Sequence, residues 1–385
     1  RNRQEFTVPA RRLLGTRVDV ISGREEARLV YLGVAHTLAD DVKSRLVIDI
    51  GGGSTEIIIG QRFEPQRMES LHMGCVSFAK TFFPDGAINQ GNYRRADDQA
   101  RLLRAPVRHQ YHARHWEDCV GSSGTLRAID SLLTQQGWCE AGIDRAGLRQ
   151  LEDKLLAFEL MDDIELDGLA TQRRNVILPG LAIISALFDV FGIEHLRTSG
   201  GALREGVIYD LMGRLSHEDV RERTTSALMQ RYSVDTDTAH IVERRARVFF
   251  TATRQEWQLD TPDWELLRWI ARTHEIGLAI AHKHFNRHSA YVLRNADLPG
   301  FSQEEQEQLA ALARGQRGKL TEEIYADIAT ADVPRMERLL AIIRLAVCFK
   351  HVEKLERLPD FTLESGPDSL CFTFPPDWLD QHPLT

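Results

Sequence analysis

Two carboxylates flank a glycine-rich turn in the segment LVIDIGGGSTEIIIG, residues 46–60. Asp49 stands before the turn and Glu56 just after it. Glycine tolerates φ > 0 and lets an anion approach the backbone, so these N–H groups can converge on one phosphate. The two acids beside it can hold a divalent cation or a water molecule. The pattern predicts a phosphate site, and an ordinary glycine hairpin with a solvated glutamate is the alternative.

A second pair of acids, Glu25 and Glu26, follows a predicted helix start at Ser22. The sequence SGRE fits a capping box, in which the serine is the N-cap and the glutamate bonds back to it. Glu25 then has a structural task, whereas Glu26 projects about 100° further around the helix. Glu26 is therefore the better candidate for chemistry, with a solvated helix residue as the alternative.

Two more turns rich in small residues follow predicted strands, at 119–125 (CVGSSGT) and at 193–206 (IEHLRTSGGALREG). A helix is predicted behind each turn, and small residues at a helix N-terminus suit anion binding. The candidates are Gly124 and Thr125 in the first turn and Arg204 in the second. An arginine there can bind phosphate through two hydrogen bonds, or form a plain ion pair on the helix surface.

The elements that must position these residues are a set of strands and helices. Runs at 46–50 and 55–59 are rich in β-branched residues and predict strands, and 68–73 predicts another. The segment 16–21 alternates like a short strand, and 179–188 predicts an apolar helix packed on a sheet. Repeated strand–turn units predict one α/β domain whose loops face a single cleft.

From about residue 215 glycine becomes rare and the periodicity is helical to residue 354. The predicted helices cover 220–231, 236–257, 262–280, 302–314 and 334–351. This all-α domain holds a cluster of histidines, with His274-Glu275 near a helix end and His282, His284 and His288 in a predicted loop. Such a cluster could bind a metal. Two short strands, 361–364 and 369–374, are predicted after it.

Composition limits the classes of function. The chain has 385 residues, with 43% hydrophobic and 27% charged residues, and a net charge of −8. That balance is typical of a globular protein of several domains and argues against nonspecific nucleic-acid binding. Five cysteines without a CxxC pair, no integral membrane segment and no signal peptide predict a cytoplasmic protein. Peripheral association with the inner membrane is left open.

Five motifs occur in an order that resembles the exopolyphosphatase / guanosine pentaphosphate phosphohydrolase family of bacterial phosphatases. They are SGREEAR (22–28), DIGGGSTE (49–56), MGCVSF (73–78), GSSGT (121–125) and GALREG (201–206). Gly53 and the Val76-Ser77-Phe78 run look more like the exopolyphosphatase branch. The other branch tends to carry alanine at the loop position and a Thr-Trp pair after the cysteine.

The resemblance implies an α/β actin-like phosphatase core followed by an all-α HD-like domain. Residues 1–30 would be the remnant of a first half-domain, 31–214 the second half-domain, 215–354 the HD-like domain and 355–385 the start of a small C-terminal α/β domain. Glu26 would match the catalytic glutamate, and Asp49 and Glu56 the acids near Mg²⁺. The implied phosphate-binding residues are Gly51, Gly52, Gly53, Ser54, Thr55, Gly124, Thr125 and Arg204.

The chain also departs from the family pattern. Family members begin with a strand and a phosphate loop that are expected to lie before Arg1, so a catalytically incomplete fragment is one hypothesis. For the helical domain, the pattern favours a metal-free domain that guides an anionic polymer. The residues expected to guide it are His282, Lys283, His284, Arg287 and His288.

Three functions follow from the resemblance. The first is an exopolyphosphatase that processively releases orthophosphate from inorganic polyphosphate. The second is hydrolysis of the 5′ γ-phosphate of guanosine pentaphosphate (pppGpp). The third is a non-catalytic protein that binds polyphosphate or (p)ppGpp. A homodimer is expected in each case, and neither nucleic acid nor an integral membrane segment is expected.

Overall fold

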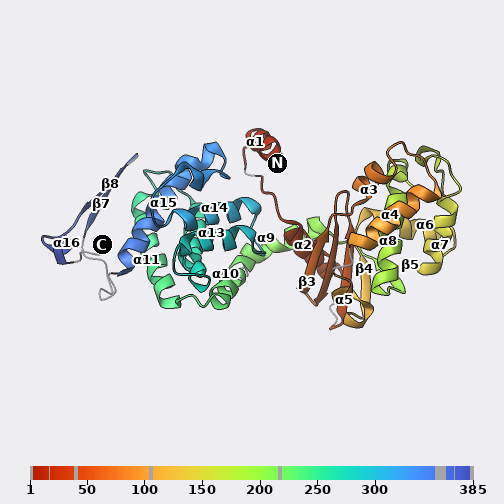
Figure 1. The fold of residues 1–385 in the computed structure, drawn as a ribbon, viewed down its shortest axis with the longest axis horizontal. Coiled ribbons are helices and arrows are strands. Elements are labelled where there is room, and N and C mark those ends of the chain that lie inside the picture. The colour runs from red at the N-terminus through yellow and green to blue at the C-terminus, as the bar shows by residue number, and fades with distance from the viewer. Residues whose placement is uncertain are drawn as a thin grey trace. The chain divides into compact units, whose positions relative to one another are not determined.

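The computed structural model describes residues 3–16, 18–38, 42–103, 107–215, 219–351, 361–367 and 369–381. It separates into two compact units. Residues 22–219 form an α/β unit, and the residues up to 21 together with those from 220 onward form a helical unit. Figure 1 shows the elements of each unit. The half-domain boundary expected near residue 30 stays a prediction.

The α/β unit is built on a mixed six-stranded sheet in the order β3-β2-β1-β4-β6-β5. Strands β1, β4 and β6 are parallel neighbours, whereas β2 and β3 extend the sheet as an antiparallel hairpin beyond β1. The strands are β1 (Ser44–Ile50), β2 (Thr55–Gln61), β3 (Glu64–Leu71), β4 (Asp118–Gly121), β5 (Ile143–Asp144) and β6 (His195–Thr198). The two strands predicted on either side of the glycine turn are therefore confirmed, and they pair with each other. Parallel strands end at one edge, so the turns after β1, β4 and β6 come together.

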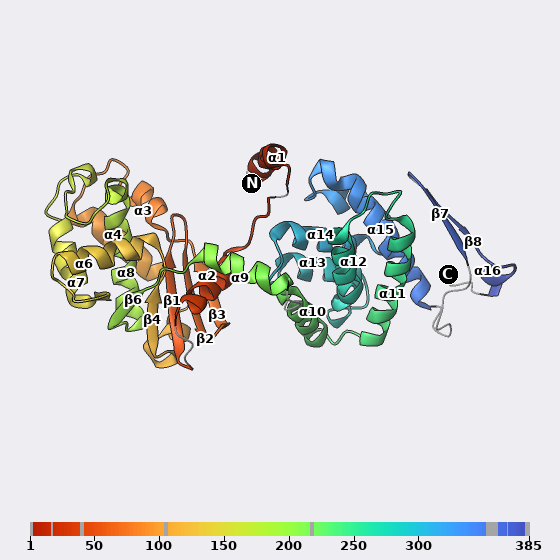
Figure 2. The same cartoon turned by 180° about the vertical axis from the view of Figure 1, so that it is seen from behind.

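Apolar side chains that point alternately to the two sides of the strands are buried on both faces of the sheet. Leu46, Ile48 and Ile50 belong to one apolar cluster, and Val47 and Ile58 belong to another. Helices cover the first face and lie on the same side of the sheet in Figures 1 and 2. They are α3 (Cys75–Phe82), α4 (Gln90–Leu103), α6 (Gly124–Gln135), α7 (Arg145–Leu155) and α8 (Arg174–Phe191). On the other face lie α2 (Gly23–Thr37) and α9 (Leu203–Leu215), while the short α5 (Arg108–Tyr111) leads into β4.

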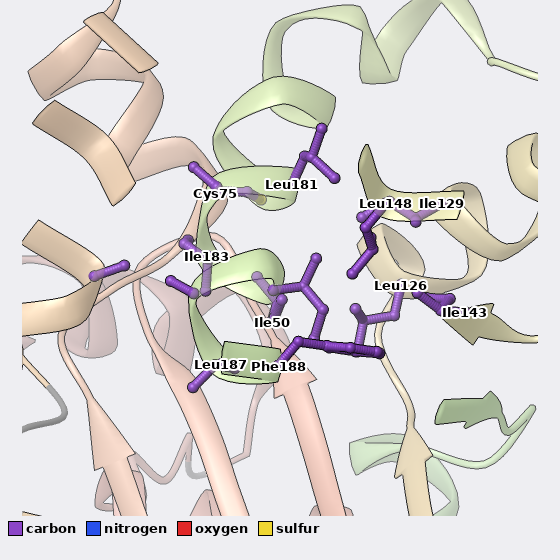
Figure 3. Close-up of a cluster of buried hydrophobic side chains, with 14 of the residues drawn as sticks. Ile50, Cys75, Leu126, Ile129, Ile143, Leu148, Leu181, Ile183, Leu187 and Phe188 are labelled. Carbon is purple, nitrogen blue, oxygen red and sulfur yellow. The ribbon is translucent and has the colours of Figure 1, made fainter. Parts of the chain in front are cut away.

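Helix α8 is the central helix of the first face. Its side chains Leu181, Ile183, Leu187 and Phe188 meet Ile50 and residues of α6 and α7 in Figure 3. By length and composition alone, the segment Thr171–Phe191 could cross a membrane. Of its most apolar stretch, however, 67% is buried inside the unit. Burial on this scale is typical of the core helix of a globular domain. The prediction of an apolar helix packed on the sheet is confirmed.

Helices α2 and α9 cross at backbone contact. A Cβ atom on Gly206 would lie 1.8 Å from the Leu29 carbonyl oxygen, and one on Gly33 would lie 2.0 Å from that of Ala202. Only glycine permits this approach. The crossing fixes the N-terminal part of α9, which carries Arg204, against the helix that carries Glu26.

The helical unit has its own apolar core. Its helices are α1 (Arg3–Leu14), α10 (Val220–Arg231), α11 (Thr236–Thr253), α12 (Thr261–Thr273), α13 (Phe285–Asn295), α14 (Gln303–Gly315), α15 (Val333–Cys348) and α16 (Trp378–Gln381). The hairpin β7 (Thr362–Gly366) and β8 (Ser369–Thr373) packs on the same core. The assignment of residues 355–385 to the start of a further domain stays a prediction.

Two local predictions are wrong. No strand forms over residues 18–21, where the Val20 carbonyl instead accepts a hydrogen bond from the Gln303 N–H; Arg17 lies outside the described residues. The histidine segment is not all loop, since α13 begins at Phe285 and contains His288. His284 precedes this helix in a left-handed conformation, with φ of 60°.

Candidate functional site

The three turns meet at one cleft of about 540 Å³ in the α/β unit. Gly51 and Gly52 line it from the turn after β1, residues 122–125 from the turn after β4, and residues 202–204 from the turn after β6. The remaining lining includes Asp49, Cys75, Val76, Arg127, Gln172 and Arg173. The sequence-based prediction that several loops face one cleft is confirmed.

The glycine turn reaches its shape by a route that the sequence does not reveal. None of Gly51, Gly52 and Gly53 has a φ in the left-handed region, so the expected use of φ > 0 is wrong. The Gly52 carbonyl instead accepts hydrogen bonds from the N–H groups of Val76 and Ser77, at 2.9 and 3.0 Å. A Cβ on Gly74 would lie 2.4 Å from the Gly52 carbonyl carbon. The start of α3 therefore anchors the turn.

The other predicted residues of this turn differ in accessibility. Gly52 and Gly53 are exposed, and Ser54 is half-buried. Thr55 is fully buried, and its hydroxyl donates to the Met73 carbonyl. The Thr55 hydroxyl therefore stabilises the turn on the side away from the cleft. Gly51 and Gly52 line the cleft with backbone atoms.

The N-terminus of α6 forms the opposite part of the cleft. Ser123 is its N-cap and accepts a hydrogen bond from the Leu126 N–H at 3.0 Å. The terminus presents its remaining N–H groups and the positive end of the helix dipole, both of which favour an anion. Gly124 and Thr125 line the cleft as predicted in the sequence, although the Thr125 hydroxyl donates to the Cys75 sulfur at 3.6 Å.

Three arginines line the same cleft, and only Arg204 was predicted from the sequence. Arg127 lies on α6 and Arg173 immediately before α8. Arg173 packs against the helix N-terminus so closely that a Cβ on Gly124 would lie 2.3 Å from its Nη2 atom. The sequence contains one signal for Arg127, its place two residues after the GSSGT motif in the first turn of the predicted helix, and none that links Arg173 to Gly124.

Asp49, at the end of β1, is the acid that lines the cleft directly. The Ser122 hydroxyl donates to its Oδ2 atom at 2.6 Å. Burial raises the pKa of Asp49, while this hydrogen bond and the charge of Arg127 oppose the rise. The carboxylate therefore sits between the acid cluster and the arginines.

Glu56 lies directly opposite Asp49 in the β1–β2 ladder. It is 1% exposed, and the Ser70 hydroxyl donates to its Oε1 atom at 2.8 Å. Burial raises the pKa of Glu56 to about 7, with further increases from the charges of Glu26 and Asp49. Hydrogen bonds from Ser54 and Ser70 oppose the increase.

Glu26 completes the acid group from the first turn of α2. Burial, and then the charge of Asp49, raises its pKa. Its neighbour Glu25 is instead held by Arg28, which donates to both of its carboxylate oxygens at 2.9 and 2.8 Å and also pairs with Asp210. The Ser22 N-cap is confirmed, with its hydroxyl accepting from the Glu25 N–H. Glu25 is thus structural, and Glu26 faces the acids.

The acids could supply some, but not all, of the ligands of a divalent cation such as Mg²⁺. Mg²⁺ prefers oxygen ligands, takes one or two protein carboxylates and keeps several waters. Asp49 and Glu56 offer such oxygens, and burial raises the pKa of both, with the charges of Glu26 and Asp49 adding to the rise for Glu56; a bound cation would relieve these penalties. Within the described ranges no three His, Cys, Asp or Glu side chains form a ready metal site. The remaining ligands would have to be water and substrate phosphate.

The histidine cluster lies in the helical unit. His274 is fully buried with its Nδ1 atom 2.8 Å from the Ala271 carbonyl oxygen, and burial lowers its pKa to about 4. Glu275 pairs with Lys350. Four of the five residues expected to guide a polymer line a second cleft of about 590 Å³, together with Arg314, Arg317 and Lys319; they are His282, Lys283, His284 and Arg287. His288 is not among the residues lining that cleft.

Comparison with known proteins identifies the family. Residues 1–215 match the Ppx/GppA phosphatase family, and residues 220–385 match domain III of Ppx/GppA phosphatases. The chain belongs to the Ppx/GppA phosphatase family. As a member, it is a hydrolase of the class that acts on phosphoanhydrides. The α/β core followed by a helical domain, predicted from the motifs, is confirmed.

Two curated relatives are similar over the whole chain. A guanosine-5′-triphosphate,3′-diphosphate pyrophosphatase from Photobacterium profundum is 37% identical over 384 residues, which is 100% of this chain and 76% of the relative. The protein of the same name from Aeromonas hydrophila is 38% identical over 384 residues, with 100% and 77% covered. Among solved structures, an exopolyphosphatase-like protein has a TM-score of 0.50 at 24% identity, covering 56% of this chain and 74% of its own.

These names bear on the branch within the family. The sequence motifs favoured the exopolyphosphatase branch, whereas both curated relatives carry the pyrophosphatase name. The comparisons therefore support the second of the predicted functions better than the first, and the branch itself is not settled by them.

Proposed function

We propose that this phosphatase hydrolyses the terminal phosphoanhydride of pppGpp, releasing orthophosphate from its 5′ end. The observation that carries the proposal is the cleft in which a helix N-terminus and three arginines converge on Asp49, whose charge also raises the pKa values of Glu26 and Glu56. The similarity to two guanosine-5′-triphosphate,3′-diphosphate pyrophosphatases favours this substrate over a homopolymer.

The positive side of the cleft would bind the phosphate chain. Arg127, Arg173 and Arg204 can each donate paired N–H groups to phosphate oxygens, and the α6 N-terminus adds backbone N–H groups. Phosphoryl transfer depends mainly on positioning and on neutralising charge, with little covalent chemistry for the protein to perform. The arginines and the helix N-terminus would both position the phosphate chain and neutralise its charge.

The acid side would place the attacking water. Glu26, whose pKa is raised by burial and by the charge of Asp49, is suited to accept a proton from a water molecule. Asp49 and Glu56 would hold Mg²⁺, which when bound neutralises phosphate charge. Ser122 orients Asp49, and Ser70 orients Glu56. Asp49 and Glu56 thus each have a hydroxyl partner that fixes the carboxylate without cancelling its charge.

Inorganic polyphosphate is the second candidate substrate. Gly53 and the run 76–78 resemble the exopolyphosphatase branch, and the structure places Val76 at the cleft, 41% exposed. Phe78 is buried in the core, so a difference there acts on the cleft only indirectly. Both substrates end in the same phosphoanhydride, and the same cleft residues would serve either one.

The deciding experiment is orthophosphate release from pppGpp and from long-chain polyphosphate, each also added as competitor of the other. Release that depends on Mg²⁺, with a higher kcat/KM for pppGpp, supports the proposal. A higher kcat/KM for polyphosphate assigns the second candidate. Binding of either substrate without release from the wild-type chain would overturn hydrolysis and leave the binding-protein hypothesis.

The metal assignment has its own test. Asp49→Asn should raise the Mg²⁺ concentration for half-maximal rate by about ten-fold, because one of two carboxylate ligands loses its charge. Asp98→Asn, at an exposed position of α4, removes the same charge away from the cleft and is the control. An unaltered Mg²⁺ curve for Asp49→Asn would make Asp49 a structural residue.

A further inference from the structure

Helices α11 and α12 of the helical unit carry a cluster of arginines outside the two clefts discussed so far. Arg244 and Arg247 lie on α11, and Arg268 and Arg272 lie on α12. All four line one hollow of about 430 Å³, together with His240, Glu243 and Trp264. None of these residues belongs to the catalytic cleft or to the histidine-lined cleft.

The two helices contribute differently to the charge of the hollow. Arg268 and Arg272 are both paired with Glu222 and with Glu243, for example Arg268 Nη2 to Glu222 Oε2 at 2.7 Å and Arg272 Nε to Glu243 Oε2 at 2.7 Å. Two cations therefore meet two anions on that side. Arg244 and Arg247 are exposed and form no ion pair in the part of the chain that the structure describes. The hollow keeps an excess of positive charge in a chain whose net charge is −8.

The arginines are also held in place. The Arg247 guanidinium stacks over the Trp264 ring at 4.4 Å, and that of Arg268 over Trp269 at 4.8 Å. Stacking fixes the plane of the guanidinium fork while leaving its N–H groups free to bind an anion. Less side-chain entropy is then lost when a ligand arrives. Such a preorganised fork fits phosphate oxygens through two parallel hydrogen bonds.

We propose that this hollow is a second ligand site, which binds an oligophosphate anion through Arg244 and Arg247. The ligand is either a free inorganic oligophosphate or the phosphate chain of a nucleotide. A single phosphate would leave part of the site unused, since His240 and Arg247 are spaced about 10 Å apart along the helix axis. A nucleic acid fits poorly, because half of the arginines are already neutralised and the chain as a whole is acidic.

The test is titration calorimetry with inorganic tripolyphosphate, in the Glu26→Gln background and with a chelator so that no hydrolysis occurs. The Arg244→Ala/Arg247→Ala variant should weaken one class of sites by ten-fold or more. Arg127→Ala/Arg173→Ala should affect only the other class, in the catalytic cleft. The matched control is Arg231→Ala/Arg254→Ala, which removes two exposed arginines elsewhere in the helical unit. Arg244→Glu alone provides a second variant that keeps the Arg247–Trp264 stack.

The outcomes separate the alternatives. Equal loss of affinity for tripolyphosphate and for guanosine triphosphate, in the α11 variants only, supports a site that recognises the phosphate chain. Loss for the nucleotide alone would overturn it in favour of base recognition, and tighter binding of a duplex oligonucleotide to the same arginines would overturn it in favour of nucleic acid. Equal weakening in the control variant, or no weakening in either α11 variant, would reduce the hollow to general surface charge.

Discussion

The cleft of the α/β unit and the core of the helical unit use the same kinds of charged side chain in opposite ways. At the cleft, burial raises the pKa values of Glu26, Asp49 and Glu56, the charge of Asp49 adds to the rise for the other two, and none of the three forms an ion pair among the described residues. In the helical unit Glu275 is neutralised by Lys350, and Asp332 by Arg11. Acids left uncompensated are unfavourable for folding, so their retention indicates chemistry. Paired acids indicate structure.

The largest expected effect is at the unpaired acids of the cleft. Glu26→Gln should lower kcat by about 10³-fold with little change in KM, because it removes the proposed base and keeps the shape. The neighbouring Glu25→Gln is the matched control. It breaks the pairing with Arg28 and should lower stability while largely preserving kcat per folded molecule. Equal kcat values for the two variants, measured by orthophosphate release, would show that Glu26 is not the base.

Next in size is the loss of a paired acid's partner. Lys350→Met leaves the half-buried Glu275 carboxylate without its ammonium and should destabilise the helical unit by about 3 kcal/mol. It should leave kcat and the Mg²⁺ requirement unchanged. Denaturant unfolding followed by tryptophan fluorescence gives the free energy, with the exposed Lys319→Met as control. A lowered kcat without loss of stability would instead make Lys350 part of the functional site.

A comparable effect should appear as a dependence on pH. Burial lowers the pKa of His274 to about 4, from an ordinary 6.5, so the folded state favours the neutral ring. The unfolded chain then binds the proton first, and stability falls as the pH drops from 6.5 toward 4 by about 3 kcal/mol at most. Above pH 6.5 this contribution is fully present. His274→Gln should reduce the slope of unfolding free energy against pH in this window, and the exposed His282→Gln should retain it.

The smallest effect concerns the arginine wall. Gly124→Ala places a methyl group where the Arg173 guanidinium lies, so the side chain must move and KM should rise about ten-fold. Because the displaced atoms end a flexible side chain, stability should change by less than about 1 kcal/mol. Gly200→Ala is the control, since a Cβ there meets nothing within 4 Å and the residue does not line the cleft. Similar KM values for the two variants would remove Arg173 from the phosphate site.

Local patterns predicted a large part of this architecture. The β-branched runs on either side of the glycine turn could only be strands, and the turn between them made them a hairpin. The distinction between Glu25 and Glu26 also followed from local spacing, since the N-cap at Ser22 fixes where each glutamate points. Helix α13 was missed because its first turn is polar and basic and lacks a conventional N-cap: His284, in a left-handed conformation, occupies that position.

By itself, the sequence determined the strand–turn units, the family motifs and the identity of the acids, because short-range periodicity and residue type decide them. Only the tertiary structure decided three other features. It brought Arg173 against Gly124, it shaped the glycine turn through the start of α3 without positive φ, and it buried Glu56 near two other acids, so that its pKa rises to about 7. Each depends on atoms distant in the chain, and local propensity carries no information about such distances.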